Sequence, residues 1–374
     1  MRAAQLPVHR PAAAKLMTID ARGAFRHTLR ATFAEWLRPK DLVVANDAAT
    51  LPASLQGTHV RTGARIEVRL AGRRSLDVDA VKCFDAIVFG DGDFRTRTEH
   101  RPSPPTLLPG DRLLLGPLRA TIEKALGHPR LVRLTFDGTP AEIWAGLVRH
   151  GRPIQYAHVP APLALWDVWT SHAALPVAFE PPSAGFLLSW EVQAEIRARG
   201  AQFATLTHAA GISSTGDPAL DVRLPFDEPY FIPSATVEAI GIAKSCGGRI
   251  VAIGTTVVRA LEHAAGEDGS VAPGFGVADQ RIGADTVLRV VDALVSGTHE
   301  PGSSHHELLR AFATDASLAR ALDEFERRRY TTHEFGDSVL IERAHVKRDI
   351  LARGCAPVVA NRTTRTPTFV RQSA

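Results

Sequence analysis

The residues with the clearest chemical potential in this chain are a glycine and two threonines that follow a short apolar run. Residues 250–253 (IVAI) are apolar and mostly β-branched, which predicts a strand buried on both faces, as in a parallel sheet. Gly254 interrupts this strand, and Thr255 and Thr256 are expected to cap a helix over residues 256–265. Backbone N–H groups and two hydroxyls would then lie at the carboxyl edge of a sheet, where α/β proteins bind ligands.

An arginine lies one helical turn beyond this joint. Arg259 follows Thr255 at i+4, so the two side chains belong to the same end of the predicted helix. A guanidinium there can hold a carboxylate through two parallel hydrogen bonds, or it can form a structural salt bridge with Glu262 or another acid. No lysine follows the glycine, so the segment is not a phosphate-binding Walker loop.

Alternating helix and strand patterns place this joint in an α/β domain. Apolar spacing predicts strands over 41–45 and 202–206, an apolar run over 284–296, and helices over 28–38, 189–199, 233–246, 304–313 and 317–329. From residue 55 to 148, short alternating runs are separated by Gly, Pro and Asp turns, which indicates an all-β module. We therefore expect an α/β fold in which a barrel-like main domain (1–56 and 151–345) is interrupted by a small inserted β-barrel domain (57–150).

Composition excludes several classes of protein. The chain has 374 residues, of which 45% are hydrophobic, and this suits two or three globular domains. Its three cysteines lack paired spacing, which indicates a reducing, cytoplasmic compartment and no zinc ribbon. No run approaches the ~18 apolar residues of a membrane span. The net charge of +4 comes from residues 346–374, a tail with six basic residues and one acid, which is expected to be flexible or to contact nucleic-acid phosphates.

Several short segments follow one another in an order shared with one enzyme family. They are residues 41–47 (DLVVAND), 182–186 (PSAGF), 205–211 (TLTHAAG), 228–230 (EPY), 248–265 (GRIVAIGTTVVRALEHAA), 291–301 (VDALVSGTHEP) and 335–341 (FGDSVLI). Together they resemble segments of the S-adenosylmethionine:tRNA ribosyltransferase-isomerase family of queuosine biosynthesis. The resemblance extends over roughly residues 5–342 and implies the family's fold.

The chain departs from this family at three histidine positions. The family's histidines in these segments correspond to Leu187, Thr207 and Phe226 here, whereas a fourth corresponds to His299 and is retained. Imidazole is the side chain best suited to proton transfer near neutral pH. The losses therefore favour a relative with altered chemistry or without activity.

The resemblance implies that the ribosyl part of S-adenosylmethionine is transferred to a 7-aminomethyl-7-deazaguanine base in tRNA and isomerised, with release of adenine and methionine. S-adenosylmethionine is then a substrate, tRNA is the expected partner, and neither a metal nor an organic cofactor is implied. A monomer without membrane contact is expected. His305 and His306 are adjacent and would point about 100° apart on a helix, so they do not suit one shared ion.

Such a reaction requires a base for the ribose carbon beside the sulfonium, a proton for adenine, and groups that orient the ribose. The candidate catalytic residues are His208, Asp47, Glu228 and His299. Asp47 also fits an Asx turn, and His208 also fits a surface loop. The expected substrate-binding residues are Asn46, Ser183, Gly185, Gly254, Thr255, Thr256, Arg259, Asp292 and Asp337, although the last two also suit structural roles.

Three functions remain open from the sequence. The first is the family's reaction on a tRNA base. The second is a divergent paralogue that binds S-adenosylmethionine or a related nucleoside but modifies a different acceptor, and the third is a non-catalytic binding protein on the same scaffold. The missing histidines favour the second and third, whereas the intact strand–glycine–threonine–helix segment favours retained ligand binding.

Overall fold

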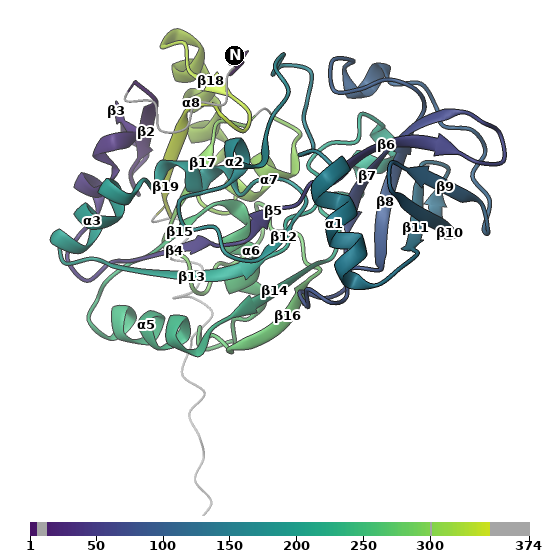
Figure 1. Cartoon of the computed structure of the whole chain (residues 1–374). Coiled ribbons are helices and arrows are strands. Elements are labelled where there is room, and N and C mark those ends of the chain that lie inside the picture. Colours follow the sequence, from purple (N-terminus) through teal and green to yellow (C-terminus); the bar gives the residue numbers. More distant parts are fainter. Residues whose placement is uncertain (6–12, 300, 345–374) are drawn as a thin grey trace, which may run out of the picture.

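The structure is a computed structural model that describes residues 1–5, 13–299 and 301–344. A nine-stranded sheet forms the main domain, and a closed six-stranded β-barrel lies beside it (Figure 1). The expected fold class, an α/β main domain with an inserted β-barrel, is confirmed. The basic tail over 346–374 lies outside the described residues.

The sheet has the strand order β16-β14-β13-β4-β15-β17-β19-β2-β3. In that order the strands are Gly274–Ala278, Glu228–Ile232, Gln202–His208, Leu42–Asn46, Ile250–Ile253, Ala293–Gly297, Ser338–Glu342, Lys15–Ile19 and Phe25–Leu29. The four central strands β13, β4, β15 and β17 run parallel. Their carboxyl ends therefore meet at one edge of the sheet, as the sequence predicts.

The central strands β4 and β15 are largely apolar because helices cover both faces of the sheet. Along β4, Leu42 and Val44 join a core with helices α5 (Ser234–Ser245), α6 (Thr255–His263), α7 (Ser304–Leu309) and α8 (Asp315–Arg327). Val43 and Ala45 face the other way and join a core with α3 (Trp190–Ala198) and a 3₁₀-helix (Arg30–Trp36). This alternation follows from the two-residue period of a strand. Among the described residues, no helix combines the length and apolar character that a bilayer crossing needs.

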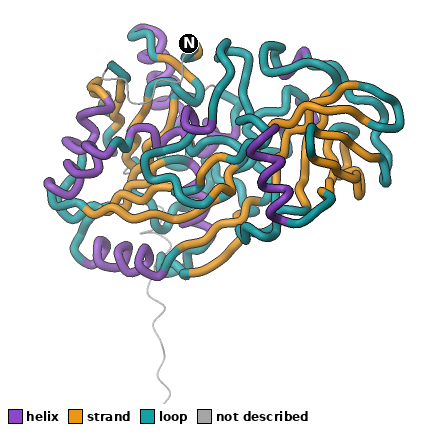
Figure 2. The backbone as a smooth tube through the Cα atoms, in the orientation of Figure 1, coloured by secondary structure: helices purple, strands orange, loops and turns teal. Residues whose placement is uncertain are grey.

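The inserted barrel closes in the order β10-β11-β8-β7-β6-β9. Its strands gather at the right of the molecule in Figure 2. Its strands in chain order are β6 (Ser54–His59), β7 (Arg65–Gly72), β8 (Cys83–Phe89), β9 (Arg112–Leu115), β10 (Leu118–His128) and β11 (Leu131–Phe136). Helix α1 (Pro140–His150) follows, with a capping box made by Thr139 and Glu142. Its Ile143 and Leu147 join the core of the barrel.

The remaining elements are short. They are β1 (Arg2–Ala3), β5 (Ala49–Thr50), β12 (Pro176–Ala178), β18 (Thr331–Thr332), α2 (Leu165–Val168), α4 (Pro218–Asp221) and 3₁₀-helices at Thr98–His100 and Ser183–Leu187. The predicted strands and the helices over 189–199, 233–246 and 317–329 are confirmed within a few residues. The helix predicted over 304–313 ends already at Leu309.

The helix predicted over 28–38 is wrong. Residues up to Leu29 pair with β2 as strand β3, and only a 3₁₀-helix follows. The Arg30 guanidinium is buried here and donates from Nε to Ser338 Oγ at 2.9 Å. A tertiary hydrogen bond of a buried charge thus overrides the local apolar spacing, since helix propensity is a weak preference.

Candidate active site

The joint after β15 forms much as the sequence predicts. Strand β15 ends at Ile253, and α6 begins at Thr255. Gly254 has φ 97° and ψ 152°, a combination that is essentially restricted to glycine. The expectation that the threonines cap the helix is wrong, because Gly254 occupies the N-cap position without a side-chain cap. Thr256 Oγ1 instead accepts a hydrogen bond from Asn46 Nδ2 at 3.3 Å.

A cavity of about 190 Å³ opens at this edge of the sheet. Of the thirteen predicted site residues, seven line it: Ser183, Glu228, Gly254, Thr255, Thr256, Arg259 and His299. Further lining comes from residues 180–182, 210–213 and 304–305, so the cavity lies between segments that are distant in sequence. Backbone amides, hydroxyls, carboxylates and imidazoles thus converge on one space, as expected of a small-molecule site.

Glu228 is the anion at the centre of this cavity wall. Its Oε2 accepts hydrogen bonds from Arg259 Nη1 and, at 2.9 Å, from His208 Nε2, while Oε1 accepts the Gly211 N–H at 2.6 Å. Burial alone would raise the pKa of Glu228, but the Arg259 charge and the His208 hydrogen bond lower this pKa below its ordinary value. Glu228 therefore stays ionised and presents negative charge to the cavity.

Arg259 differs from its expected role as a clamp for a substrate carboxylate. Both of its terminal nitrogens donate to protein acceptors: Nη1 to Glu228, and Nη2 to the carbonyls of Phe226, Ala278 and Gln280. Only Nε has no partner among the described residues. The alternative partner Glu262 instead accepts the backbone N–H groups of residues 289–291. The guanidinium thus serves mainly to hold Glu228.

His208 is not placed to act as the base. It is fully buried, and its Nδ1 lies 2.7 Å from the Thr256 carbonyl while its Nε2 faces Glu228. Both ring nitrogens are therefore occupied by protein acceptors and neither faces a substrate. His208 is therefore a positioning residue that links Glu228 to the first turn of α6.

The Asn46-Asp47 pair fixes the ends of two neighbouring strands. Asn46 donates to the His208 carbonyl and accepts the His208 N–H, both at 2.9 Å. Asp47 accepts a hydrogen bond from Thr207 Oγ1 at 2.6 Å, and burial raises its pKa. Neither residue lines the cavity, and their expected contact with the ribose stays a prediction.

Three further predicted residues have structural positions. Asp292 accepts the Ile250 N–H at 3.1 Å and pairs with Arg343, at the amino end of β15, away from the cavity. Asp337 accepts the backbone N–H groups of Lys15 and Thr331 at 2.7 and 2.8 Å. Gly185 packs so closely that a Cβ would lie 2.9 Å from a methyl carbon of Thr170. Their spacing after strands could not distinguish these roles from ligand binding.

Two imidazoles line the cavity from neighbouring segments. The rings of His299 and His305 stack with centroids 4.6 Å apart, and His299 Nε2 lies 2.9 Å from Ser296 Oγ. Burial lowers the pKa of both histidines, so both are neutral near pH 7. Sequence reasoning considered His305 only as a metal ligand, although its place at the start of a predicted helix near His299 was a usable signal.

A second carboxyl group of the cavity, Glu180, was missed by the sequence analysis. Its side chain is 7% exposed, and it accepts a hydrogen bond from the Tyr156 hydroxyl. Burial raises the pKa of Glu180 to about 7, although hydrogen bonds from Ser213 and Tyr156 oppose this shift. An acidic residue two positions before the segment 182–186 was the available signal.

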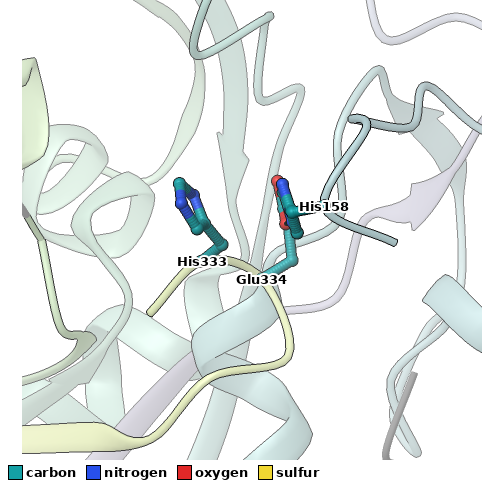
Figure 3. A group of neighbouring side chains, drawn as sticks. All are labelled: His158, His333 and Glu334. Carbon is teal, nitrogen blue, oxygen red and sulfur yellow. The ribbon is translucent and has the colours of Figure 1, made fainter. Parts of the chain in front are cut away.

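Another cluster of titratable groups combines His158, His333 and Glu334 (Figure 3). The two imidazole rings are stacked, with centroids 4.3 Å apart and planes inclined by 21°. Because each ring lone pair lies in its ring plane, stacked rings direct their lone pairs side by side and not at one ion. His158 Nε2 instead lies 2.9 Å from the Glu334 carboxylate. We interpret the cluster as a hydrogen-bonded charge pair.

Comparison with known proteins shows which family this sequence matches. The sequence profile of the queuosine biosynthesis protein family matches residues 1–341. The chain belongs to this family. A relative from Pelobacter propionicus is 32% identical, with 91% of this chain and 96% of the relative covered. One from Geobacter sulfurreducens is 34% identical, with 90% and 95% covered. Both are named S-adenosylmethionine:tRNA ribosyltransferase-isomerase.

A solved structure with a related sequence also matches. It is a crystal structure of an S-adenosylmethionine tRNA ribosyltransferase from Thermotoga maritima, with 25% sequence identity and a TM-score of 0.47. The match covers 90% of this chain and 95% of the other.

The positions at which this family member lacks histidine do not line the cavity. Leu187 packs in the core between the sheet and α3. The Thr207 hydroxyl donates to Asp47, and Phe226 packs against the core of the barrel. The cavity itself retains two imidazoles and three carboxyl groups, so the three substitutions leave it with groups capable of proton transfer.

Proposed function

We propose that this protein transfers the ribosyl moiety of S-adenosylmethionine to a 7-aminomethyl-7-deazaguanine base in tRNA and isomerises it, with release of adenine and methionine. The observation that carries the proposal is the cavity at the sheet edge with the ionised Glu228 in its wall, in a chain that belongs to the queuosine biosynthesis family. A sulfonium is a fixed cation, and Glu228 is a buried carboxylate that its partners keep ionised.

The first turn of α6 supplies a second recognition element for the same substrate. The N–H groups at the start of this helix have no intrahelical acceptor, and the helix dipole favours an anion there. Thr255 and Thr256 line the cavity at this point. We assign the methionine carboxylate to this turn and the sulfonium to the side of Glu228, so that Arg259 is not required as a direct ligand.

A groove next to the cavity suits a nucleic-acid backbone. Five arginines and three aspartates line it: Arg73, Arg74, Arg133, Arg223, Arg281, Asp85, Asp227 and Asp279. Arg281 and Pro225 line both the groove and the cavity, which makes the two spaces neighbours. Arg133 is already held by Asp85 through two hydrogen bonds of 2.7 and 2.9 Å.

Arg73 is the residue of this groove that most needs an anion. It is 4% exposed, and its Nε and Nη1 have no hydrogen-bond partner among the described residues. Burial lowers the pKa of this guanidinium to about 10. An unpartnered buried guanidinium is costly, and a phosphate oxygen would satisfy it. We therefore assign a tRNA phosphate to Arg73.

The replacement Arg73→Gln is expected to weaken tRNA binding by about threefold to tenfold and to reduce the dependence of log Kd on log salt by about one unit. Filter binding between 50 and 300 mM salt measures both. Arg119→Gln, which removes an exposed arginine on β10 outside the groove, is the matched control. An unchanged salt dependence in a folded Arg73 variant would reject the assignment.

Adenine release tests the function as a whole. The protein is mixed with S-adenosylmethionine and tRNA that carries the aminomethyl-deazaguanine base, and free adenine is measured by chromatography. We expect release with this tRNA and none with tRNA that carries guanine at that position. Release that requires a different acceptor would instead support the divergent paralogue, and calorimetric binding without release would support a binding protein.

A further inference from the structure

Three carboxyl groups line the cavity, those of Glu180, Glu228 and Glu307, and the pKa values of the first two are shifted in opposite directions. Glu228 is held by a guanidinium and an imidazole, whereas no ion pair of Glu180 occurs among the described residues. The closest polar partners of Glu180 are the hydroxyl of Tyr156 and the residue Ser213. Where neighbouring titratable groups have their pKa values displaced in opposite directions, the two groups usually take different roles in catalysis.

One short segment fixes the two carboxyl groups relative to each other. The Gly211 N–H binds Glu228 Oε1 at 2.6 Å, and two residues later Ser213 binds Glu180. The Phe179 N–H donates to the Ala210 carbonyl at 2.8 Å, which ties the strand before Glu180 to the same segment. Both carboxyl groups thus face the cavity from a shared backbone support.

Glu180 also lies next to the strand–helix joint. It begins the run 180–184, all of which lines the cavity, and a Cβ added to Gly254 would lie 3.5 Å from the Cβ of Ala184. Glu180 and the first turn of α6 therefore line the same cavity, and the run 180–184 lies next to the joint.

The charged groups around Glu180 leave its carboxylate a competent base. Glu334 repels the negative charge of Glu180, and burial acts in the same direction. Arg69 attracts it, but Arg69 lies over the ring of Tyr156 and is bound at 2.8 Å by Glu67. The result is a pKa of about 7 for Glu180, which makes its carboxylate a stronger base than Glu228 or the two cavity histidines.

We propose that Glu180 is the general base that removes a proton from the ribose carbon attached to the sulfonium of S-adenosylmethionine. In this step the C–H bond breaks, its electron pair stays on the carbon beside the positive sulfur, and the proton passes to a carboxylate oxygen of Glu180. Glu228 remains a carboxylate throughout and stabilises the sulfonium. The proposal rests on the proposed function only for its substrate and not for the identity of the acceptor.

Hydrogen exchange at that carbon tests the base directly. Protein and S-adenosylmethionine are incubated in D₂O, and deuterium uptake at the 5′ carbon is followed by NMR and mass spectrometry, with and without tRNA. We expect uptake with the unaltered protein and a loss of about 10²-fold to 10⁴-fold in Glu180→Gln. Calorimetry should show S-adenosylmethionine affinity within about threefold of the unaltered protein. Glu238→Gln, an exposed change on α5, is the matched control.

The pH profile separates a base from a merely structural residue. For the unaltered protein, kcat/KM or the exchange rate should rise with pH through about 7 and then level off, since only the carboxylate accepts the proton. Tyr156→Phe removes a hydrogen bond that favours the carboxylate, so its rise should move to higher pH. Glu180→Asp should keep the rise at a lower rate.

The outcomes distinguish this inference from the proposed function. Adenine release that persists in Glu180→Gln with the same pH profile would overturn the base and leave the function intact. Glu180-dependent exchange without adenine release from the aminomethyl tRNA would establish the base and reject that acceptor. The absence of both exchange and release in the unaltered protein would reject both.

Discussion

Replacement of Arg259 by alanine is expected to lower the free energy of unfolding by about 3–5 kcal/mol, because it leaves a buried carboxylate without its cation. Arg259 is 4% exposed and Glu228 is 6% exposed, so water cannot replace the lost charge. Urea unfolding followed by circular dichroism measures the change. Arg259→Lys, which keeps a positive charge, should lower the free energy of unfolding clearly less than Arg259→Ala does.

The control for this prediction is an arginine in an exposed ion pair. Arg310 at the C-cap of α7 binds Asp315 at 2.7 Å and Glu307 at 2.8 Å, but the side chains of Arg310 and Asp315 are 32% and 70% exposed. Its replacement by alanine should cost no more than about 1 kcal/mol. Equal losses for the two arginine variants would show that the Arg259–Glu228 pair contributes no more than an exposed contact.

The same pair predicts a pH dependence of stability. The folded state lowers the pKa of Glu228, so the stability that this residue contributes is fully present above its unfolded pKa of about 4.3. It is lost as the pH falls through the lower, folded pKa. The stability difference between the unaltered protein and Glu228→Gln should therefore be constant from pH 6 to 8 and shrink below about pH 4.

Gly254→Ala is expected to reduce S-adenosylmethionine affinity by about tenfold or more and to cost about 1–3 kcal/mol of stability. The backbone at this position, φ 97° and ψ 152°, is strained for any residue with a Cβ. Relaxation would turn the first amides of α6 away from the cavity. Calorimetry with S-adenosylmethionine and urea unfolding measure the two effects.

Gly241→Ala provides the comparison for this change. Gly241 lies within α5, and a Cβ there would meet nothing within 4 Å. Alanine at such a helical site should leave stability unchanged or raise it by up to about 1 kcal/mol. If Gly254→Ala binds S-adenosylmethionine as tightly as Gly241→Ala does, the joint does not hold the substrate.

The architecture of this protein was predictable from sequence because its signals are local. Residue type alone indicates the local backbone structure of the apolar run 250–253, of the glycine after it and of the amphipathic helix that follows. The short alternating runs of the inserted barrel do the same. The local pattern gives a wrong secondary structure where a residue distant in sequence is the binding partner, as for the buried Arg30 that binds Ser338.

The site was less predictable because its roles depend on partners from other segments. His208 and Glu228 are twenty residues apart in sequence. Only the pairing of β13 with β14 shows that the His208 imidazole is hydrogen-bonded to the Glu228 carboxylate. Glu180 offers no motif, and its character arises from burial and from Tyr156. Residue type identified several of the segments that line the cavity, whereas tertiary neighbours decide which of their groups are already held by protein partners.

The pairing of β2 with β19 has a consequence for synthesis on the ribosome. Strand β2 (Lys15–Ile19) lies between β3 and β19 (Ser338–Glu342), so its partner emerges more than 300 residues later. In the β2–β3 hairpin, the edge of β2 that later pairs with β19 therefore has no partner until Ser338–Glu342 is translated. A chaperone that shields nascent edges would act on this hairpin, and truncation before Ser338 would leave it undocked.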